Sequence, residues 1–482
     1  MELVLYGLCA IILVSSLYLL RLFDNARRNL PPGPRPLPLI GNLLDVGAQL
    51  PHQSLSRLAQ RHGPLMTLHL GAVTTIVASS SDAARDILQR HDAAFSAHAV
   101  PEVVRACAHD RVCSAELFAP HRLDAQQHLR SEKVNRLVSH VARLAREGAV
   151  VDVGRVVFTT VLNLLSSTVF TVDLTDLDDD RGESAGNFKD VITEFSSCVG
   201  MPNVLDFFPA VAPLDPQRLR RRLARVFARL HAVFDKQIER RMRDRAAGEP
   251  PKNDFLDVLL DYRSTEDGRS FNRQTLLSLF TDLFAAATDT TTTGVEWAMA
   301  ELLRNPPSMA KAREELDRVI GSKPKIEESD ISQLDYLQAV VKETFRLHPP
   351  APLLLPHRAE TTKNIGGYTV PKGARILVNV WVIGRDSKVW CEPNEFMPER
   401  FLQREVDFNG HNFDLVPFGS GRRICPGMPL AVRMVHLMLA SLLHRFQWTL
   451  PPDVEKKGLD MAEDFRVVIA LTTPLQAIAT PI

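Results

Sequence analysis

A cysteine-centred loop near the carboxyl end limits the possible folds of this chain more than any other stretch. The loop spans residues 417–427 and reads PFGSGRRICPG. Cys425 comes just before an apolar run at 430–443 that is typical of a helix, so its sulfur would lie at a helix amino end. Backbone N–H groups of Gly427 and Met428 would favour the ionised thiolate there. We therefore expect an ionised cysteine held on a tight loop.

The residues around Cys425 point to a flat ligand. Gly421 and Gly427 allow tight turns and a close approach of the backbone to a planar group. Arg423 could meet an anionic group on that ligand. A thiolate held in this way is one of the few protein ligands that makes haem iron activate oxygen. A buried inert thiol is the alternative for a single cysteine, but the fixed spacing with Phe418 favours a haem ligand.

The amino terminus predicts a membrane anchor. Residues 3–20 carry no charge and are long enough to span a bilayer. Arg21, Arg27 and Arg28 follow this run, against the single Glu2 before it, so the rest of the chain is expected in the cytosol. A cleaved signal peptide is the alternative, but its charges would precede the apolar core and a small-residue cleavage site would follow.

Composition describes a large folded protein without naming its chemistry. The 482 residues are 45% hydrophobic, and 57 Lys and Arg balance 57 Asp and Glu, so nothing suggests nucleic-acid binding. Six scattered cysteines with no CxxC spacing argue against a disulfide framework or a zinc site. After the anchor at 1–20, a stiff Pro-rich hinge at 21–45 precedes one domain at 46–482.

The body of the domain is patterned mostly for helices. A hairpin is expected at 65–70 and 74–78, followed by a helix capped by Ser81 or Asp82. The strongly basic stretch 218–243 also carries apolar residues at helical spacing, which indicates a packed helix with a solvated basic face. Contact of that face with a membrane surface is the lesser alternative.

A threonine-rich segment at 283–294 is the second chemical element, inside a helix expected to end near Arg304. Threonine hydroxyls compete for backbone carbonyls and can bend a helix. An acid beside a hydroxyl in such a place, Asp289 with Thr290, is a plausible proton relay for the reduction of dioxygen. A bent helix without a catalytic role is the alternative.

A helix end at 342–349 supplies a third element. Glu343 and Arg346 lie three residues apart and share a helical face, and Arg400 offers a second arginine. The apolar stretch 351–356 that follows is expected to line a substrate pocket. His357 comes next, and a satisfied core histidine is its alternative role.

Together these motifs resemble the haem-thiolate cytochrome P450 monooxygenases, whose signature is the cysteine loop. The anchor, hinge, threonine-rich helix, Glu-x-x-Arg, Pro-Glu-Arg-Phe and cysteine loop follow in the family order over nearly the whole chain. The resemblance is closest to plant microsomal members that oxidise terpenoids, as the phrases at 253–260 and 417–427 look like theirs. It implies a mainly helical α+β fold, with a helical bundle around haem, a small β-rich lobe and one N-terminal transmembrane helix.

The resemblance also assigns roles to residues. It makes Cys425 the axial ligand of haem b and Asp289 with Thr290 the catalytic pair, and it makes Glu343, Arg346 and Arg400 a buried supporting triad. In the family a glycine usually stands where Ala287 stands here, and the extra methyl group would crowd the oxygen pocket. The other implied contacts are with the cofactor for Arg423, His357, Phe418, Gly419 and Gly427, and with the substrate for Ala286, Ala287, Leu353 and Leu354.

The implied activity is insertion of one atom of O2 into an apolar small molecule, a terpenoid or other plant specialised metabolite. NADPH would supply electrons through a separate reductase, because the chain has no Gly-rich dinucleotide fingerprint. The protein would be anchored in the endoplasmic reticulum membrane, with its catalytic domain in the cytosol. A related fold rearranges peroxides without a reductase, but Asp289 and Thr290 argue against that reaction.

One departure from the family pattern opens a second possibility. Family members carry a Trp-x-x-x-Arg motif on an early helix that holds the haem propionates, whereas all four tryptophans here lie at or after Trp297. The expected helix is missing around 96–118, and neither Arg111 nor Arg122 has the motif around it. The alternative is therefore an impaired or haem-free, membrane-anchored paralogue.

Overall fold

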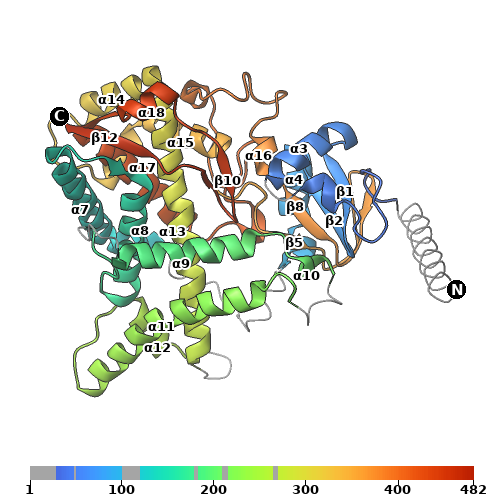
Figure 1. Cartoon of the computed structure of the whole chain (residues 1–482), viewed down its shortest axis with the longest axis horizontal. Helices are drawn as coiled ribbons and strands as arrows, with labels where there is room; N and C mark the ends of the chain where they lie inside the picture. Colours follow the sequence, from blue (N-terminus) through green and yellow to red (C-terminus); the bar gives the residue numbers. More distant parts are fainter. Residues whose placement is uncertain (1–28, 48–49, 100–119, 178–182, 209–214, 264–269) are drawn as a thin grey trace.

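The computed structural model describes residues 29–47, 50–99, 120–177, 183–208, 215–263 and 270–482. Helices fill most of the molecule, and a smaller lobe built on a twisted sheet lies to one side (Figure 1). The mainly helical fold with a small β-rich lobe, predicted from the sequence, is confirmed. The expected membrane span at 3–20 lies outside the described residues.

The helices follow each other along the chain as α2 (Leu43–Val46), α3 (Pro51–His62), α4 (Ser81–Arg85), α6 (Pro120–Ala125), α7 (Gln127–Arg146), α8 (Val153–Phe170), α9 (Glu183–Gly200), α10 (Val204–Phe207), α11 (Leu219–Ala246), α12 (Phe255–Asp261), α13 (Arg273–Arg304), α14 (Pro306–Val319), α15 (Asp335–Leu347), α16 (Val380–Ile383), α17 (Met428–Arg445) and α18 (Pro452–Lys457). Short 3-10 or π turns form η1 (Asp86–Arg90), η2 (Asp92–Phe95), η5 (Glu328–Gln333), η6 (Pro398–Phe401) and η7 (Gly421–Arg423).

The strands are β1 (Leu65–Leu70), β2 (Val73–Ala78), β3 (Ala97–His98), β4 (Val151–Asp152), β5 (His357–Arg358), β6 (Lys363–Ile365), β7 (Tyr368–Val370), β8 (Arg375–Val378), β9 (Phe446–Thr449), β10 (Glu463–Phe465), β11 (Ile469–Leu471) and β12 (Gln476–Pro481). The largest sheet has the order β1-β2-β8-β5-β3, in which only β2 and β8 run parallel. Smaller sheets pair β10 with β11, β6 with β7, and β12 with both β4 and β9.

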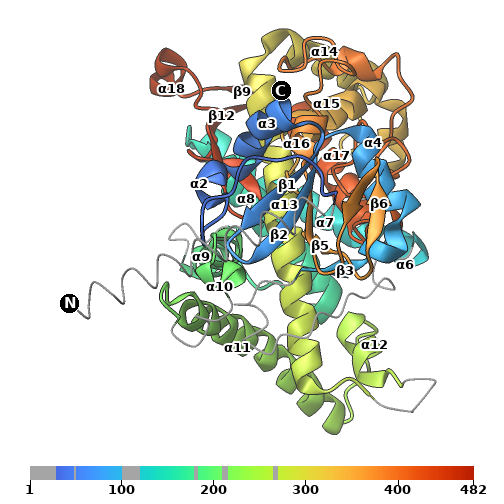
Figure 2. The same ribbon diagram turned by 90° about the vertical axis from the view of Figure 1, so that its right-hand side faces the viewer.

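The 32-residue helix α13 runs through the helical lobe from one side to the other (Figure 2). It packs against α8, α15 and α17, and most of its carboxyl half is buried. Its end at Arg304 confirms the prediction. Among the described residues, α8 is the helix long and apolar enough to cross a membrane, but 89% of it is buried in the core.

Three local predictions differ in outcome. The basic helix is confirmed, since α11 buries apolar residues along one face and leaves its arginines exposed or half-buried, except Arg241, which is buried and pairs with Asp254. The expected hairpin is also confirmed as β1 and β2. The helix cap, however, was placed one residue too late, because Ser80 is the N-cap and its Oγ accepts the N–H of Ala83 at 3.3 Å. Ser80 has the extended backbone that a cap needs, whereas Ser81 and Asp82 already lie inside α4.

A buried ion-paired triad joins α15 to the irregular chain that follows it. Arg346 donates through Nε and Nη2 to the two carboxylate oxygens of Glu343, at 2.7 and 2.8 Å, and Arg400 Nε donates to the same carboxylate at 3.0 Å. The side chains of Glu343 and Arg346 have no accessible surface. The remaining donors of Arg346 bind the carbonyl oxygens of Gly384, Pro393 and Glu395. The triad therefore fixes both side chains and backbone.

Replacing Arg346 by alanine is expected to lower the free energy of unfolding by about 3–5 kcal/mol, because the Glu343 carboxylate stays buried without its main partner. Equilibrium unfolding in urea, followed by tryptophan fluorescence, measures the loss. Lys311→Ala is the matched control, since it removes an exposed cation 2.6 Å from Glu399 and should cost less than about 1 kcal/mol. Equal losses in the two variants would contradict a supporting role for the triad.

Candidate active site

The cysteine loop reaches α17 through two glycines with left-handed backbone. Gly419 has φ +73° and Gly421 has φ +66°. The N–H of Cys425 donates to the carbonyl oxygen of Phe418 at 2.9 Å, which closes the loop. The side chain of Ser420 ties the loop to the carbonyl oxygen of Gly410 at 2.6 Å. These two hydrogen bonds hold the backbone of the cysteine loop in place.

Gly421 is required by a close approach as well as by its φ. A Cβ atom built on it would lie 2.0 Å from the carbonyl oxygen of Leu88 in η1. That contact joins the cysteine loop to the β-rich lobe. Sequence reasoning assigned Gly421 to a ligand, but this structure shows the backbone of η1 occupying the space beside it.

Cys425 is half-buried, forms no disulfide, and precedes α17 by three residues. The N–H of Met428, expected to favour the thiolate, instead donates to the carbonyl oxygen of Cys425 at 3.3 Å. This assignment was wrong because the turn before α17 uses that donor for its own closure. The sulfur still lies at the amino end of α17, whose dipole favours negative charge.

His357 and Arg423 both line one small recess. The recess has a volume of about 10 Å³ and is also lined by Leu88 and Phe95. Arg423 Nε donates to the carbonyl oxygen of Ser96 at 2.6 Å, and its exposed side chain leaves other donors at the surface. The two residues assigned to anionic groups of the cofactor are therefore brought together here.

The hydrogen bond and the burial of His357 determine its tautomer and its charge. Its Nδ1–H donates to the carbonyl oxygen of Phe95 at 2.7 Å. Burial lowers the pKa of His357, and the positive charge of Arg423 lowers it further, against the effect of that hydrogen bond. Neutral His357 can then only accept at Nε2, so donation to a carboxylate needs the imidazolium form, which a nearby anion would favour.

One face of α13 remains accessible although the helix lies inside the helical lobe. Ala286 is exposed, and Ala287 and Thr290 are half-buried, whereas Thr288 is fully buried. The hydroxyl of Thr290 donates to the carbonyl oxygen of Ala286 at 2.7 Å. Small side chains at an accessible point of a central helix leave space for a ligand.

Asp289 lies beside this face but turns toward α9. Its Oδ2 accepts a hydrogen bond of 2.7 Å from the hydroxyl of Ser196. Burial raises the pKa of Asp289, while the hydrogen bond from Ser196 and the charges of Arg466 and Lys189 act in the opposite direction. Sequence reasoning missed Ser196, because a single serine in an amphipathic helix 93 residues away carries no signal.

The two leucines expected to line the pocket separate in space. Leu354 has a left-handed backbone, φ +50°, and its side chain would lie 3.7 Å from a Cβ on Gly419, so it lies against the cysteine loop. Leu353 packs instead with the core of the β-rich lobe around Leu55 and Met66. Only Leu354 is brought to the loop by direct contact.

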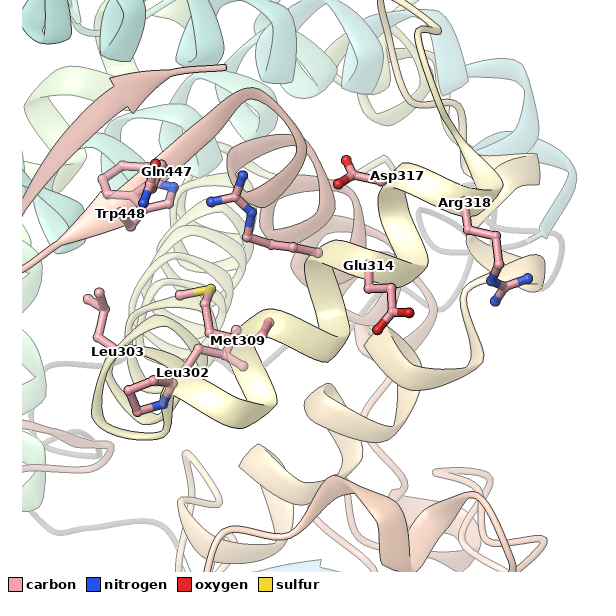
Figure 3. A pocket seen from close by; sticks show the side chains of 11 residues that line it. Leu302, Leu303, Met309, Glu314, Asp317, Arg318, Gln447 and Trp448 are labelled. Carbon is pink, nitrogen blue, oxygen red and sulfur yellow. The ribbon is translucent and has the colours of Figure 1, made fainter.

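A larger open recess of the described residues lies elsewhere. It has a volume of about 880 Å³ and lies on the surface between the end of α13, α14 and β9. Figure 3 shows Leu302, Leu303 and Met309 at its floor and Glu314 and Arg318 along α14. None of its lining residues belongs to the site predicted from the sequence, and it lacks any thiol or catalytic pair.

The residues of the cysteine loop and of α13 fit a haem group. Apolar side chains on the cysteine loop, on α13 and on the first turn of α17 keep accessible surface, namely Phe418, Ala286 and Leu430, as a planar apolar ligand requires. α17, which Cys425 precedes, packs directly on α13, where a Cβ on Gly294 would lie 3.4 Å from Val435. A sulfur ligand, apolar side chains, and the pair Arg423 and His357 match the chemistry of haem with its carboxylates.

The stretch where the Trp-x-x-x-Arg helix was expected to be missing falls largely outside the described residues. Residues 100–119, including Arg111, lie outside the described residues. Arg122 is described and half-buried in α6.

Comparison with known proteins settles the family. The family model for cytochrome P450 matches residues 31–477. A geraniol 8-hydroxylase of Swertia mussotii is 45% identical over 96% of each chain. A 7-ethoxycoumarin O-deethylase of Helianthus tuberosus is 46% identical over 94% of this chain and 95% of its own. A ferruginol synthase of Salvia miltiorrhiza is 40% identical over 94% of each. Cytochromes P450 bind haem b through a cysteine thiolate, and this chain is a monooxygenase of the cytochrome P450 family.

Proposed function

We propose that this monooxygenase hydroxylates an apolar terpenoid, taking electrons from NADPH through a separate membrane-bound reductase. The half-buried Cys425 on its hydrogen-bonded loop, at the amino end of a helix packed on α13, is the observation that carries the proposal. The net reaction converts substrate, O2, NADPH and one proton to hydroxylated product, water and NADP⁺. Relatives named for geraniol and ferruginol support the substrate class.

Different residues would bind the cofactor, deliver protons and contact the substrate. Cys425 would hold haem as its axial thiolate, and Arg423 with His357 would hold its anionic edge. The bound haem would supply the reduction of O2 and the transfer of one oxygen atom. Thr290 and Asp289 would deliver the protons that this reduction consumes. Ala286 and Ala287 would orient an apolar substrate by contact, without competing hydrogen bonds.

Location and partner follow from the amino-terminal sequence. The uncharged run at 3–20 with its following arginines supports an anchor in the endoplasmic reticulum membrane, with the body in the cytosol. A reductase in the same membrane is then the natural electron source. The inert alternative raised by the missing Trp-x-x-x-Arg motif is less favoured, because chains similar over almost their whole length are named as active enzymes.

Replacing Cys425 by alanine is expected to reduce geraniol oxidation to the rate without enzyme, because no other residue on the loop can supply a thiolate. The assay uses the full chain with a plant NADPH-dependent reductase and product detection by mass spectrometry. Cys391→Ala is the matched control, since Cys391 is exposed and contributes only its carbonyl oxygen to the triad. Residual oxidation by Cys425→Ala, or its loss in Cys391→Ala, would contradict the ligand assignment.

Replacing Gly421 by alanine is expected to displace the cysteine loop and lower haem content, with a loss of about 2–3 kcal/mol in the free energy of unfolding. The added Cβ would collide with the Leu88 carbonyl oxygen at 2.0 Å. Haem absorbance per protein and urea unfolding measure the two effects. Gly458→Ala is the control, because its φ of +81° is similar but no atom lies within 4 Å. It should cost only about 1 kcal/mol and keep its haem.

A further inference from the structure

A serine from α9 holds the carboxyl group that is proposed to deliver protons. Ser196 Oγ donates to Asp289 Oδ2 at 2.7 Å, and Ser196 itself is 4% exposed. α9 crosses α13 at this point, as Figure 1 shows. The hydrogen bond therefore joins two crossing helices, and both partners are fixed by the packing of their own helix.

Asp289 lies on α13 between the accessible face of the helix and the face that packs on α9. At 100° per residue, Asp289 lies about 60° from Ala286 around the helix axis, on the side away from Thr290. Ala286 marks the accessible face, and Ser196 marks the buried face toward α9. The Asp289 carboxyl thus lies on the side of α13 between the accessible face and α9.

The charged groups around Asp289 come from two other elements. Lys189 approaches from α9, and Arg466 approaches from the turn between β10 and β11. The remaining elements that pack on α13 bring no titratable group that acts on this carboxyl among the described residues. Glu296, two turns along α13, is also influenced by Lys189 and Arg466, but its carboxylate accepts the N–H of Leu475 at 2.9 Å.

We propose that Ser196 is a positioning residue that holds the Asp289 carboxyl on the α9 side and sets how tightly it binds its proton. The proposal rests on the proposed function, in which Asp289 supplies protons to the reaction. The hydroxyl of Ser196 donates a hydrogen bond to the carboxylate, so it stabilises the ionised form after the proton has left. Each proton released toward the accessible face is replaced by one from solvent, and Asp289 returns to its starting state.

Ser196 matters because it opposes the effect of burial on the pKa of Asp289. Burial raises the pKa of Asp289, and among the opposing contributions the hydrogen bond from Ser196 is the largest. Without it, Asp289 would hold its proton too tightly to release it readily. A purely structural hydrogen bond would affect stability but would leave proton release unchanged.

The test is an infrared titration of the Asp289 carboxyl in the full chain, with its band identified by loss in Asp289→Asn. Ser196→Ala is expected to raise the titration midpoint by about one pH unit, because a hydrogen bond to the charged form is removed. Ser196→Thr keeps the hydroxyl and is expected to restore the original midpoint. Ser197→Ala removes a half-buried neighbouring hydroxyl on α9 and is the matched control.

A second measurement separates this proposal from the proposed function. In Ser196→Ala, the pH dependence of kcat is expected to move upward in parallel with the infrared midpoint, with haem content unchanged. An infrared midpoint equal in Ser196→Ala and Ser197→Ala would overturn the role of Ser196. If the infrared midpoint shifts but the unmodified chain oxidises no terpenoid, the proposed substrate class fails while the role of Ser196 in setting the proton affinity of Asp289 stands.

Discussion

The structure depends on two buried arginines that supply hydrogen-bond donors to a stretch with little regular structure. Between α16 and α17 the chain runs for more than forty residues with only two single-turn helices. Arg346 and Arg400 bind backbone carbonyl oxygens at Gly384, Cys391 and Glu395 while both pair with Glu343. Buried carbonyl groups need hydrogen-bond donors. The two arginines supply these donors, so the triad fixes the backbone of a stretch that has little regular secondary structure. The cysteine loop lies at the carboxyl end of this irregular stretch, directly before α17.

The cysteine loop lies between the β-rich lobe and the helical lobe. On one side Gly421 contacts η1 of the β-rich lobe, and on the other α17 packs on α13. Between them, small apolar residues of α13 remain accessible, whereas the polar contacts of the site lie at its edges. An apolar centre with polar edges suits a flat cofactor with carboxylates and a substrate that lacks polar groups. Asp289 lies at the side of that centre, where it accepts the hydroxyl hydrogen bond of Ser196.

The sequence predicted those parts of the structure that depend on neighbours along the chain. Glu343 and Arg346 pair because a spacing of three residues brings them to one helical face. The hairpin of β1 and β2 and the end of α13 at Arg304 also follow from local sequence patterning. The sequence could not predict contacts made across the fold. Ser196 meets Asp289, and Leu88 meets Gly421, only because distant elements pack together. The choice between Ser80 and Ser81 as the cap depends on a backbone angle that two adjacent serines do not reveal.

The central claim is that Cys425 binds haem iron as a thiolate in the folded chain. The most direct measurement is the difference spectrum of the purified, reduced, full-length protein with and without carbon monoxide. The account predicts that the absorbance maximum lies at the long-wavelength position that a thiolate ligand produces. A maximum at the position of histidine-ligated haem, or a folded protein that takes up no haem, would contradict it.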